Sequence, residues 1–288
     1  MTSQPTVSIG KLVNRMLGRK QSISNDDWIK AMANIKITVA EAEIKKLEKA
    51  AIAEIKAKTK GIKAAYAWSA GKDSIALGAI CEKAGVKDCM IGVCNLEYPA
   101  FLAWVEKHKP AACEVINTGQ DINWLKEHPE FLFPDSTRAS RWFSIVQHRA
   151  QAKYVREHKI DVILLGRRKA DGNYVGKGDN IYTAKGITRY SPLSEWTHEQ
   201  LLAYIAYNNL PIPPIYGWPN GYKCGTHPWP ARQHVGSREN GWREISSIDP
   251  TLIEEAAKAG IESAIKFLEV GHESNNQCKT GKSDTGGK

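Results

Sequence analysis

The stretch between residues 65 and 80 constrains the fold of this chain more than any other. The apolar and aromatic run Ala65 to Trp68 stops at residues 69–74, which read Ser-Ala-Gly-Lys-Asp-Ser, and an apolar pattern resumes from Ile75 to Ile80. This order predicts a strand, a tight glycine turn and the start of a helix. Such a turn leaves backbone N–H groups unpaired at the positive end of a helix dipole, so we expect residues 69–74, the phosphate loop, to bind phosphate.

The spacing within the phosphate loop differs from that of the Walker A motif. A Walker A loop requires glycine where this chain has Tyr66, and serine or threonine where it has Asp73. The sequence therefore predicts a phosphate loop of another family.

The composition indicates a folded domain with an anionic partner. The chain has 288 residues, of which 42% are hydrophobic, and this is sufficient for a large buried core. Its formal net charge of +9 and isoelectric point near 9.1 favour nucleotides or nucleic acid as partners, although a basic surface can also serve solubility alone.

The sequence shows neither a membrane segment nor an export signal. No apolar run is long enough to span a bilayer, and Met1 to Pro5 lack the charged-then-apolar order of a secretory signal. The six cysteines form no Cys-x-x-Cys pair and no zinc-finger spacing. We therefore expect a cytoplasmic protein without membrane partners, in which most cysteines are buried reduced thiols. Its oligomeric state is left open.

Alternating strand and helix patterns follow from residue 61 onward. Strands are expected at residues 62–68, 89–94, 112–117 and 162–166, and helices at residues 74–84, 100–108, 121–128, 140–158 and 197–208. A glycine- and lysine-rich loop is expected over residues 169–185. The alternation predicts an α/β fold of three layers, α/β/α, around a mostly parallel central sheet. Ligands of such sheets bind beyond the carboxyl ends of the strands, where both residues 69–74 and residues 166–168 fall.

The sequence predicts four segments along the chain. A basic helical extension spans residues 1–60, with Ser24 as a helix cap and Thr38 to Glu41 in capping-box order. A phosphate-binding domain spans residues 61–230, an extension with a helical pattern residues 231–270, and a disordered tail residues 271–288. The region after Pro211 is irregular, aromatic and proline-rich. The amino-terminal helices are expected either to cover one face of the sheet or to act as a docking arm.

Three separated segments resemble the phosphoadenosine phosphosulfate (PAPS) reductase family of the PP-loop superfamily, the adenine nucleotide alpha-hydrolase-like proteins or N-type ATP pyrophosphatases. Residues 69–74 match the family's Ser-x-Gly-Lys-Asp-Ser loop, and residues 164–168 resemble its Gly-x-Arg turn. Residues 190–216 resemble its Pro-Leu-x-x-Trp segment, here Pro192 to Trp196, and the proline-rich turn that follows. The resemblance extends over about residues 60 to 230, with the segments in the family's order.

This resemblance implies an enzyme of adenine nucleotides. Some relatives cleave ATP between the alpha and beta phosphates and adenylylate an acceptor. The sulfonucleotide reductases instead use a cysteine thiolate to take sulfite from PAPS or from its dephosphorylated analogue APS. The implied nucleotide is therefore ATP, PAPS or APS, the implied metal is Mg²⁺, and thioredoxin is an implied partner only for a reductase.

The chain departs from the reductase pattern at its cysteine motif. Family reductases carry Glu-Cys-Gly-x-His close to the C-terminus, whereas the closest string here is the Cys-Gly-x-His that begins at Cys224, and Cys278 lacks both glycine and histidine. An iron–sulfur cluster needs four cysteine ligands in most cases and this region has one, so no cluster is expected. Cys224 is interpreted either as a nucleophile whose thiolate Lys223 and His227 favour, or as a packed loop cysteine.

A second departure follows the second predicted strand. Relatives often show Asp-Thr-Gly there, near the nucleoside, whereas this chain has Asn95 to Pro99. The leading prediction is therefore an enzyme that cleaves ATP or a related nucleotide at the alpha phosphate and activates or modifies an acceptor. The alternatives are a PAPS or APS reductase that uses Cys224, and a nucleotide- or nucleic-acid-binding module without catalysis.

The predicted site residues belong to the phosphate loop and to the turn after residue 165. Lys72 is expected to neutralise charge on bridging phosphate oxygens, and Asp73 either to hold Mg²⁺ through phosphate or to cap the helix. Arg167 and Arg168 are expected to contact phosphate or to form a surface ion pair with Asp171 or a glutamate. The predicted nucleotide- and phosphate-binding residues are Ser69, Ala70, Gly71, Lys72, Asp73, Ser74, Gly166, Arg167 and Arg168, and the predicted catalytic residues are Lys72, Asp73 and, in the reductase alternative, Cys224.

Other basic and aromatic residues have two interpretations each. The lysines of the 169–185 loop, with Arg189, either close over a substrate or are solvated. Arg138 and Arg141 either meet a second anionic group or have a structural role. Trp196 and Tyr204 are expected in the core. Four aromatic residues with basic neighbours are suited either to stacking on bases or to packing, namely Trp218, Tyr222, Trp229 and Trp242.

Overall fold

The computed structural model describes residue 17 and residues 22–232 and 236–270. Its contacts divide the chain into two compact units. The first contains the residues up to 92, 103–116 and 149–226, and the second contains residues 93–102, 117–148 and those from 227 onward. The boundaries at residues 60, 230 and 270 remain a prediction. The predicted tail, with Cys278, lies outside the described residues.

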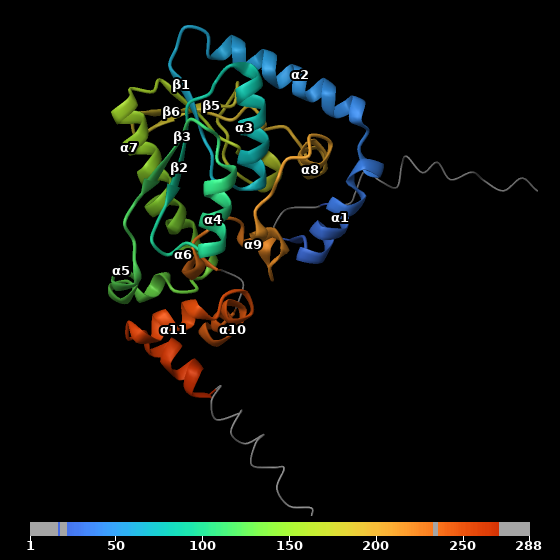
Figure 1. Cartoon of the computed structure of the whole chain (residues 1–288). Helices are drawn as coiled ribbons and strands as arrows, with labels where there is room; N and C mark the ends of the chain where they lie inside the picture. The colour runs from blue at the N-terminus through green and yellow to red at the C-terminus, as the bar shows by residue number, and fades with distance from the viewer. Residues whose placement is uncertain (1–16, 18–21, 233–235, 271–288) are drawn as a thin grey trace, which may run out of the picture. The chain divides into compact units, whose positions relative to one another are not determined.

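Six strands form one sheet in the order β3-β2-β1-β4-β6-β5 (Figure 1). Strand β1 pairs in parallel with β2 and β4, and β4 pairs in parallel with β6, while β5 is antiparallel to β6. The predicted α/β fold with a mostly parallel sheet is therefore confirmed. The strands are β1 (Ala64–Ala67), β2 (Cys89–Val93), β3 (Cys113–Asn117), β4 (Val162–Leu164), β5 (Ile181–Ala184) and β6 (Ile187–Tyr190).

Helices alternate with the strands and also precede and follow them. The α-helices are α1 (Asn25–Thr38), α2 (Glu41–Lys58), α3 (Lys72–Ala84), α4 (Pro99–His108), α5 (Ile122–Glu127), α6 (Ser136–Phe143), α7 (Arg149–His158), α8 (His198–Tyr207), α9 (Gly221–Cys224), α10 (Arg238–Ile248) and α11 (Thr251–Lys258). A π-helical turn, η4 (Ser144–His148), joins α6 to α7, and a further helical stretch covers residues 262–270. Short 3-10 turns are η3 (Pro129–Phe131), η5 (Lys169–Asp171), η6 (Pro214–Gly217) and η7 (Trp229–Ala231).

The sheet of the first unit lies between helices, as Figure 1 shows for α7 and α3. On one face, Ala65 and Ile163 share a buried cluster with Tyr154 of α7. On the other face, Tyr66 reaches α3, since a Cβ placed on Gly78 would lie 3.1 Å from its ring. Successive side chains of a strand point to opposite faces, which is why neighbours in β1 contact different helices. This alternation builds the predicted three layers.

The amino-terminal helices pack on other helices of the first unit. Helix α1 contacts α8 and α9, and α2 contacts α3 and α8. The hydroxyl of Tyr204 on α8 donates to Glu48 of α2 at 2.8 Å, and the side chain of Trp28 on α1 is completely buried. These helices therefore cover the α3–α8 layer, and α2 also reaches the sheet, where Lys58 Nζ lies 4.9 Å from the ring centroid of Tyr190 in β6.

Local capping signals explain several helix starts, but the capping box predicted at Thr38 is wrong. Ser24 caps α1 in a capping box with Asp27, and Thr197 caps α8 with Gln200. The capping box expected at Thr38 does not form, because Thr38 ends α1 and its hydroxyl donates to Asn34 O at 3.1 Å. Helix α2 begins after Ala40 without a side-chain cap.

Two other differences concern regions predicted as continuous. The helix expected at residues 140–158 is two α-helices joined by the η4 π-turn. The loop expected at residues 169–185 contains β5, which forms a hairpin with β6. Lys185 and Gly186 join these strands with φ values of 52° and 73°, the two positive φ angles of a type I′ turn. Strand β5 has only four residues, Ile-Tyr-Thr-Ala, which are too few to show a strand pattern, and its pairing with β6 gives it its conformation.

The second unit has an aromatic core of its own. Trp142 is fully buried, and its indole N–H donates to Phe131 O at 3.0 Å. Trp242 packs 5.0 Å from Phe133 and 5.7 Å from Trp229, measured between ring centroids. Trp229 and Trp242 are buried, so the packing interpretation is confirmed for both.

Candidate functional site

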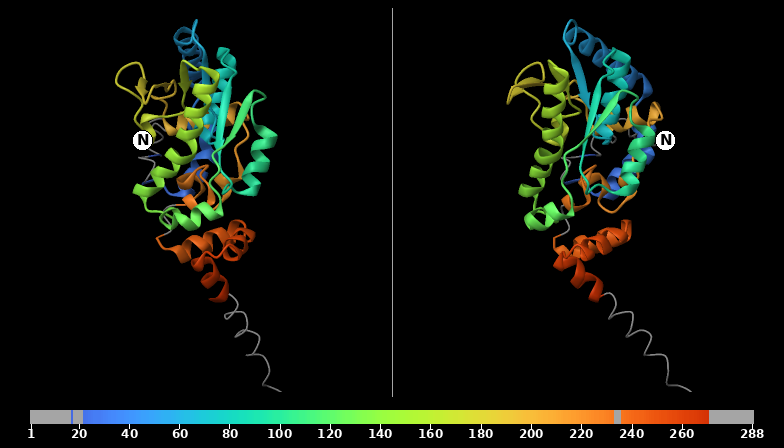
Figure 2. Two further views of the ribbon diagram at one scale, coloured as in Figure 1. Left: turned by 90° about the vertical axis from the view of Figure 1, so that its left-hand side faces the viewer. Right: turned by 60° about the vertical axis from the view of Figure 1, so that its left-hand side comes forward.

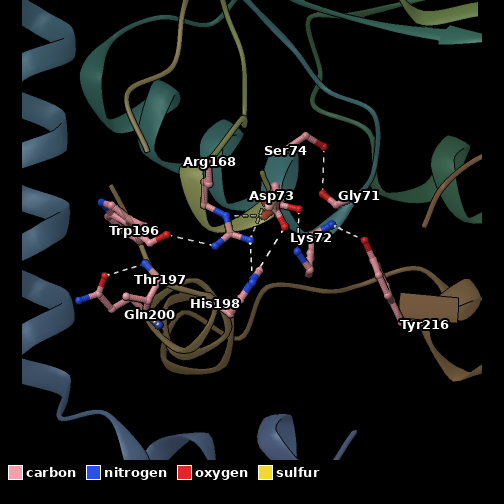
Figure 3. Close-up of polar contacts among 11 residues, drawn as sticks. Gly71, Lys72, Asp73, Ser74, Arg168, Trp196, Thr197, His198, Gln200 and Tyr216 are labelled. Atoms are coloured by element: carbon pink, nitrogen blue, oxygen red, sulfur yellow. Dashed lines mark hydrogen bonds and ion pairs between the residues drawn. The ribbon is translucent and has the colours of Figure 1, made fainter. Parts of the chain in front are cut away.

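The phosphate loop connects β1 to α3 in the first unit (Figure 3). Ala70 has a left-handed φ of 56°, and Gly71 is the N-cap residue of α3 without a side-chain capping bond. The loop therefore presents the amino end of α3, whose dipole favours an anion. Three hydroxyl and carbonyl contacts hold its shape: Ser69 Oγ to Ser74 Oγ at 3.2 Å, Ser74 Oγ to Gly71 O at 2.9 Å and Thr226 Oγ1 to Ser69 O at 2.9 Å.

The turn after β4 lies directly against this loop. A Cβ on Gly166 would lie 2.9 Å from the backbone C and O atoms of Asp73 and 3.1 Å from Ser74 N. Only glycine allows such an approach without a shift of backbone. Strands β1 and β4 are adjacent, and the chain moves from β1 to β2 on one side and from β4 to β6 on the other. The two turns therefore meet where the strand order reverses, the usual ligand position in such sheets.

A buried ion-pair network joins the two turns (Figure 3). Asp73 Oδ1 accepts from Arg168 Nε at 2.8 Å, and Asp73 Oδ2 accepts from Lys72 Nζ at 2.7 Å. The Arg168 side chain is 0% exposed and also contacts Asp171 Oδ2 at 3.0 Å and Trp196 O at 3.1 Å. The pairing with Asp171 is thus confirmed, but it is buried and not at the surface. With three oxygen partners, Arg168 is a structural cation of this turn.

His198, the first residue of α8, completes the network. Its Nδ1 accepts from Arg168 Nη2 at 3.2 Å, and its ring contacts Trp28 edge to face at 4.8 Å. Burial, followed by the charge of Arg168, lowers the pKa of His198 from 6.5 to about 4. Its Nε2 is buried with no hydrogen-bond partner among the described residues. His198 is therefore neutral at pH 7 and serves as an acceptor for Arg168.

Aromatic side chains from α1 and from the residues after 213 cover Lys72. Its Nζ lies 5.3 Å from the Trp28 ring centroid, and Trp28 stacks on Tyr222 at 5.3 Å. The backbone N–H of Lys72 donates to the hydroxyl of Tyr216 at 2.7 Å. Lys72 is only 2% exposed, so its charge is that of a buried, paired ammonium. The packing interpretation of Tyr222 is confirmed as well.

The structure brings most predicted site residues together and adds three residues that the sequence analysis did not predict. Residues 69–74 and 166–168 form one cluster, in which Arg167 Nη1 donates to the hydroxyl of Tyr182 at 2.6 Å. Trp28, His198 and Tyr216 were missed as members of the site. His198 had a local signal, because it follows the capping residue of a helix that the family's Pro-Leu-x-x-Trp segment introduces, and Tyr216 ends the proline-rich turn of the same resemblance. Trp28 comes from a distant part of the chain.

Asp73 has one predicted role that the structure contradicts, the helix cap. It does not cap α3, and both of its carboxylate oxygens accept from cations. Within the described ranges, no group of three or more His, Cys, Asp or Glu side chains is placed to hold a metal. The protein side chains alone therefore do not fit a magnesium site at Asp73. A contact to Mg²⁺ through phosphate remains a prediction.

Cys224 ends the short helix α9 and is 4% exposed. It is one of five buried cysteines outside disulfides in the described part of the chain. Thr226, two residues later, donates to the carbonyl of Ser69. The Cys-Gly-x-His segment therefore reaches the phosphate loop through Thr226, while the reactivity of Cys224 stays a prediction.

The segment that departs from the Asp-Thr-Gly pattern belongs to the second unit. Glu97 is 6% exposed, and its Oε1 accepts from Cys94 N at 3.4 Å. Burial raises the pKa of Glu97 to about 8. The segment thus holds a carboxyl group that is largely protonated at pH 7.

The second unit also contains a cavity of about 510 Å³. Arg138 and Arg238 line it together with Glu130 and Asp135. Opposite charges balance within this lining, and Arg238 donates to Pro129 O at 3.1 Å. The cavity shares no residue with the phosphate loop. Arg138 is exposed and lies 3.8 Å from Asp135, as the structural interpretation of this arginine expects.

None of the helices in the described part of the chain is long and apolar enough to cross a bilayer. Trp196 and Tyr204 are buried and meet edge to face at 5.6 Å, which confirms their predicted place in the core.

A family model and a curated relative point to the same family. The family model of the phosphoadenosine phosphosulfate reductase domain matches residues 63–223, more than half of this chain. A phosphoadenosine phosphosulfate reductase of Emericella nidulans is 27% identical over 150 residues, which cover 51% of this chain and 45% of that protein. The chain therefore matches less than half of the length of that relative.

Two solved structures are similar at low sequence identity. The phosphoadenylyl-sulfate reductase of Candida auris, a phosphate complex, has 18% identity and a TM-score of 0.47, over 62% of this chain and 92% of that one. The U34-tRNA thiolase NcsA of Methanococcus maripaludis, solved with its 4Fe-4S cluster, has 14% identity and a TM-score of 0.39, over 80% of each chain.

Proposed function

This chain belongs to the phosphoadenosine phosphosulfate reductase family, and on that premise we propose that it is an enzyme that binds ATP or a closely related adenylyl nucleotide and cleaves it at the alpha phosphate. The observation that carries the proposal is the meeting of the phosphate loop with the Gly166 turn at the point where the strand order reverses. This point combines a helix amino end with Lys72 and Arg167, which suits a polyphosphate.

In the proposed reaction, a nucleophilic acceptor attacks the alpha phosphorus of the nucleotide. A bond forms between the acceptor and this phosphorus, and the bond from the phosphorus to the bridging oxygen breaks. Pyrophosphate leaves with the bonding electron pair, and the acceptor loses its proton to solvent. Lys72 and the α3 dipole would stabilise the charge that develops on the leaving oxygen.

The shared carboxylate of Asp73 makes this role of Lys72 energetically reasonable. Removing one partner of a buried ion pair normally leaves an uncompensated charge, which is strongly destabilising. Here Asp73 keeps Arg168 at 2.8 Å when the Lys72 ammonium turns from the carboxylate to a phosphate. The network therefore allows Lys72 to exchange one anion for another while Asp73 stays paired.

A Lys72→Ala variant tests the proposal. We expect the dissociation constant of ATP, measured by calorimetry with Mg²⁺ present, to rise about 10- to 100-fold, the usual effect of losing one charged hydrogen bond. The exposed Lys87→Ala variant is the control and should bind ATP like the wild type. Unchanged ATP affinity in the Lys72 variant would contradict the site. Tight ATP binding without pyrophosphate release, in the presence of candidate acceptors, would favour a binding module without catalysis.

The second candidate function is reduction of PAPS or APS with Cys224 as nucleophile. The contact of Thr226 with the phosphate loop favours it, because it brings the Cys-Gly-x-His segment toward that loop. The thiolate would attack the sulfur of the sulfo group, the sulfur–oxygen bond to phosphate would break, and reduced thioredoxin would then release sulfite and become a disulfide. Sulfite formation that the Cys224→Ser variant loses would favour the reductase over the leading proposal.

A further inference from the structure

The outward face of α7 carries a row of exposed cations. Arg149, Lys153 and Arg156 lie at helical spacings of four and three residues, and all three are exposed. The opposite side of the helix holds Ala150 and Tyr154, which are buried against the sheet. With a rise of about 1.5 Å per residue, the row extends for roughly 10 Å. No ion pair is found for these three cations within residues 22–232 and 236–270. Their charge is therefore available to a partner.

An aromatic cluster backed by arginines lies on the β5–β6 hairpin. The Cζ atoms of Arg167 and Arg189 lie 6.0 Å and 5.9 Å from the centroid of the Tyr182 ring. Tyr174 meets Tyr182 at 5.0 Å with the ring planes 64° apart, and it is 56% exposed. An aromatic side chain this exposed offers a face on which a further ring can stack.

Strand alternation places the hairpin cluster on the α7 side of the sheet. Ile187 of β6 belongs to the buried cluster that contains Tyr154 of α7. Arg189 follows Ile187 by two residues, so its side chain points to the same face. Tyr182 is the direct partner of Arg189 across the hairpin and therefore shares that face. Both views of Figure 2 show the hairpin beside α7.

We propose that this surface, the α7–hairpin face formed by Arg149, Lys153, Arg156, Tyr174 and Tyr182, binds a single-stranded nucleic acid. A row of unpaired cations suits successive backbone phosphates, and an exposed tyrosine suits an unpaired base, whose π-face stacks on aromatic rings. An acidic peptide could pair with the cations, but its carboxylates would not stack on the aromatic cluster. Bases within a duplex are already stacked and do not present this face.

The face begins at the candidate site. Arg167, which donates to Tyr182, follows Gly166, and Gly166 lies against the backbone of Asp73. A strand bound along the face would therefore lead toward the phosphate loop. The idea that this nucleic acid carries the acceptor rests on the proposed function. The idea that it binds to the α7–hairpin face does not.

Charge reversal with a matched control tests the face. The probe is a fluorescein-labelled 20-nucleotide polythymidine or polyuridine, and its binding is followed by fluorescence anisotropy without ATP. The triple variant Arg149→Glu, Lys153→Glu, Arg156→Glu should bind at least 10-fold more weakly, and the slope of log affinity against log salt should fall by about 2, as expected for three lost phosphate contacts on a single strand. The control replaces the exposed lysines of α2, Lys46, Lys49 and Lys56, by Glu and should retain most of the affinity.

A second variant tests the stacking contribution. Tyr174→Ala removes an exposed side chain, so the fold should be kept, and the affinity for the probe should fall about 10-fold. The affinity for a 20-base-pair duplex should change much less. Equal weakening by the α7 and α2 triple variants, or tighter binding of the duplex or of polyglutamate than of the single strand, would overturn the proposal. The proposal would also be overturned if the wild-type protein bound neither polythymidine nor polyuridine.

ATP affinity separates this inference from the proposed function. Both triple variants and Tyr174→Ala should bind ATP like the wild type, because none of these residues contacts the phosphate loop. A wild-type protein that binds the oligonucleotide but not ATP would overturn the proposed function and leave the face intact. A wild-type protein that binds ATP but neither oligonucleotide would overturn the nucleic-acid face and leave the proposed function intact.

Discussion

At the scale of single residues, the candidate site depends on groups that satisfy two partners at once. Asp73 accepts from both Lys72 and Arg168, and Arg168 in turn contacts Asp171 and His198. A buried guanidinium is tolerated only when its donors are paired, and here the pairing also orients the phosphate loop against the β4 turn. Arg168 therefore organises the site, while Arg167, whose guanidinium donates to the hydroxyl of Tyr182, keeps phosphate contact as a prediction.

The close approach at Gly166 leads to a prediction about stability. In Gly166→Ala the new methyl group would lie 2.9 Å from the backbone of Asp73, so the β4 turn must move away from the phosphate loop. We expect a loss of about 1–3 kcal/mol in the free energy of unfolding, measured by urea denaturation, and weaker ATP binding. Gly217→Ala is the control, since a Cβ there meets nothing within 4 Å. Equal stability of both variants would show that the turn adapts without strain.

The lowered pKa of His198 predicts an acid-sensitive fold. A folded-state pKa of about 4 against 6.5 when unfolded means that the unfolded chain binds a proton first as the pH falls. The contribution of His198 to stability is therefore complete above pH 6.5 and is lost as the pH falls toward 4, by about 3 kcal/mol. His198→Asn, which keeps an acceptor near Arg168 but does not titrate, should lose less stability between pH 7 and pH 4.5. Identical pH profiles from urea denaturation would refute this role.

At the scale of elements, α1 contributes directly to the site although it lies far from the phosphate loop in sequence. Its Trp28 stacks on Tyr222 of α9, meets His198 of α8 and lies over the Lys72 ammonium. The side-chain carbonyl of Asn25 also accepts from Tyr222 N at 3.0 Å. Helix α1 is therefore part of the wall around Lys72, and its loss would expose this ion pair to water.

Trp28→Ala tests the contribution of α1. Replacing a fully buried tryptophan creates a cavity, so we expect a loss of about 3–5 kcal/mol in the free energy of unfolding, together with faster amide hydrogen exchange in α1 and α9. Ile29→Ala changes the next residue, which is 46% exposed, and should have little effect. If the two variants are equally stable, α1 is not docked as described.

At the scale of the whole chain, topology decides which turns can act together. Strands β1 and β4 are about a hundred residues apart in sequence, yet they pair from Ala64 with Val162 to Tyr66 with Leu164. Parallel pairing puts their carboxyl ends at one edge, and the reversal of strand order leaves room for a ligand there. Helix α7 and the side chains of the hairpin cluster lie on the same side of this sheet, and together they form the proposed nucleic-acid face.

Much of the fold was predictable because its signals are local. The strand, turn and helix around Gly71, the capping boxes at Ser24 and Thr197 and the alternation of strands and helices depend on residues close together in sequence. Strand β5 was not predictable, since its conformation comes from pairing with β6. The break between α6 and α7 has no proline or glycine to announce it.

The sequence by itself determined that a strand, a tight turn and a helix follow one another around Gly71, because glycine and hydrophobic periodicity act over a few residues. Only the tertiary structure decided that Lys72 is buried beneath Trp28, that Arg168 is an internal cation and that Tyr216 meets the Lys72 amide. Each of these depends on long-range packing, in which burial and paired charge outweigh what the neighbouring residues indicate.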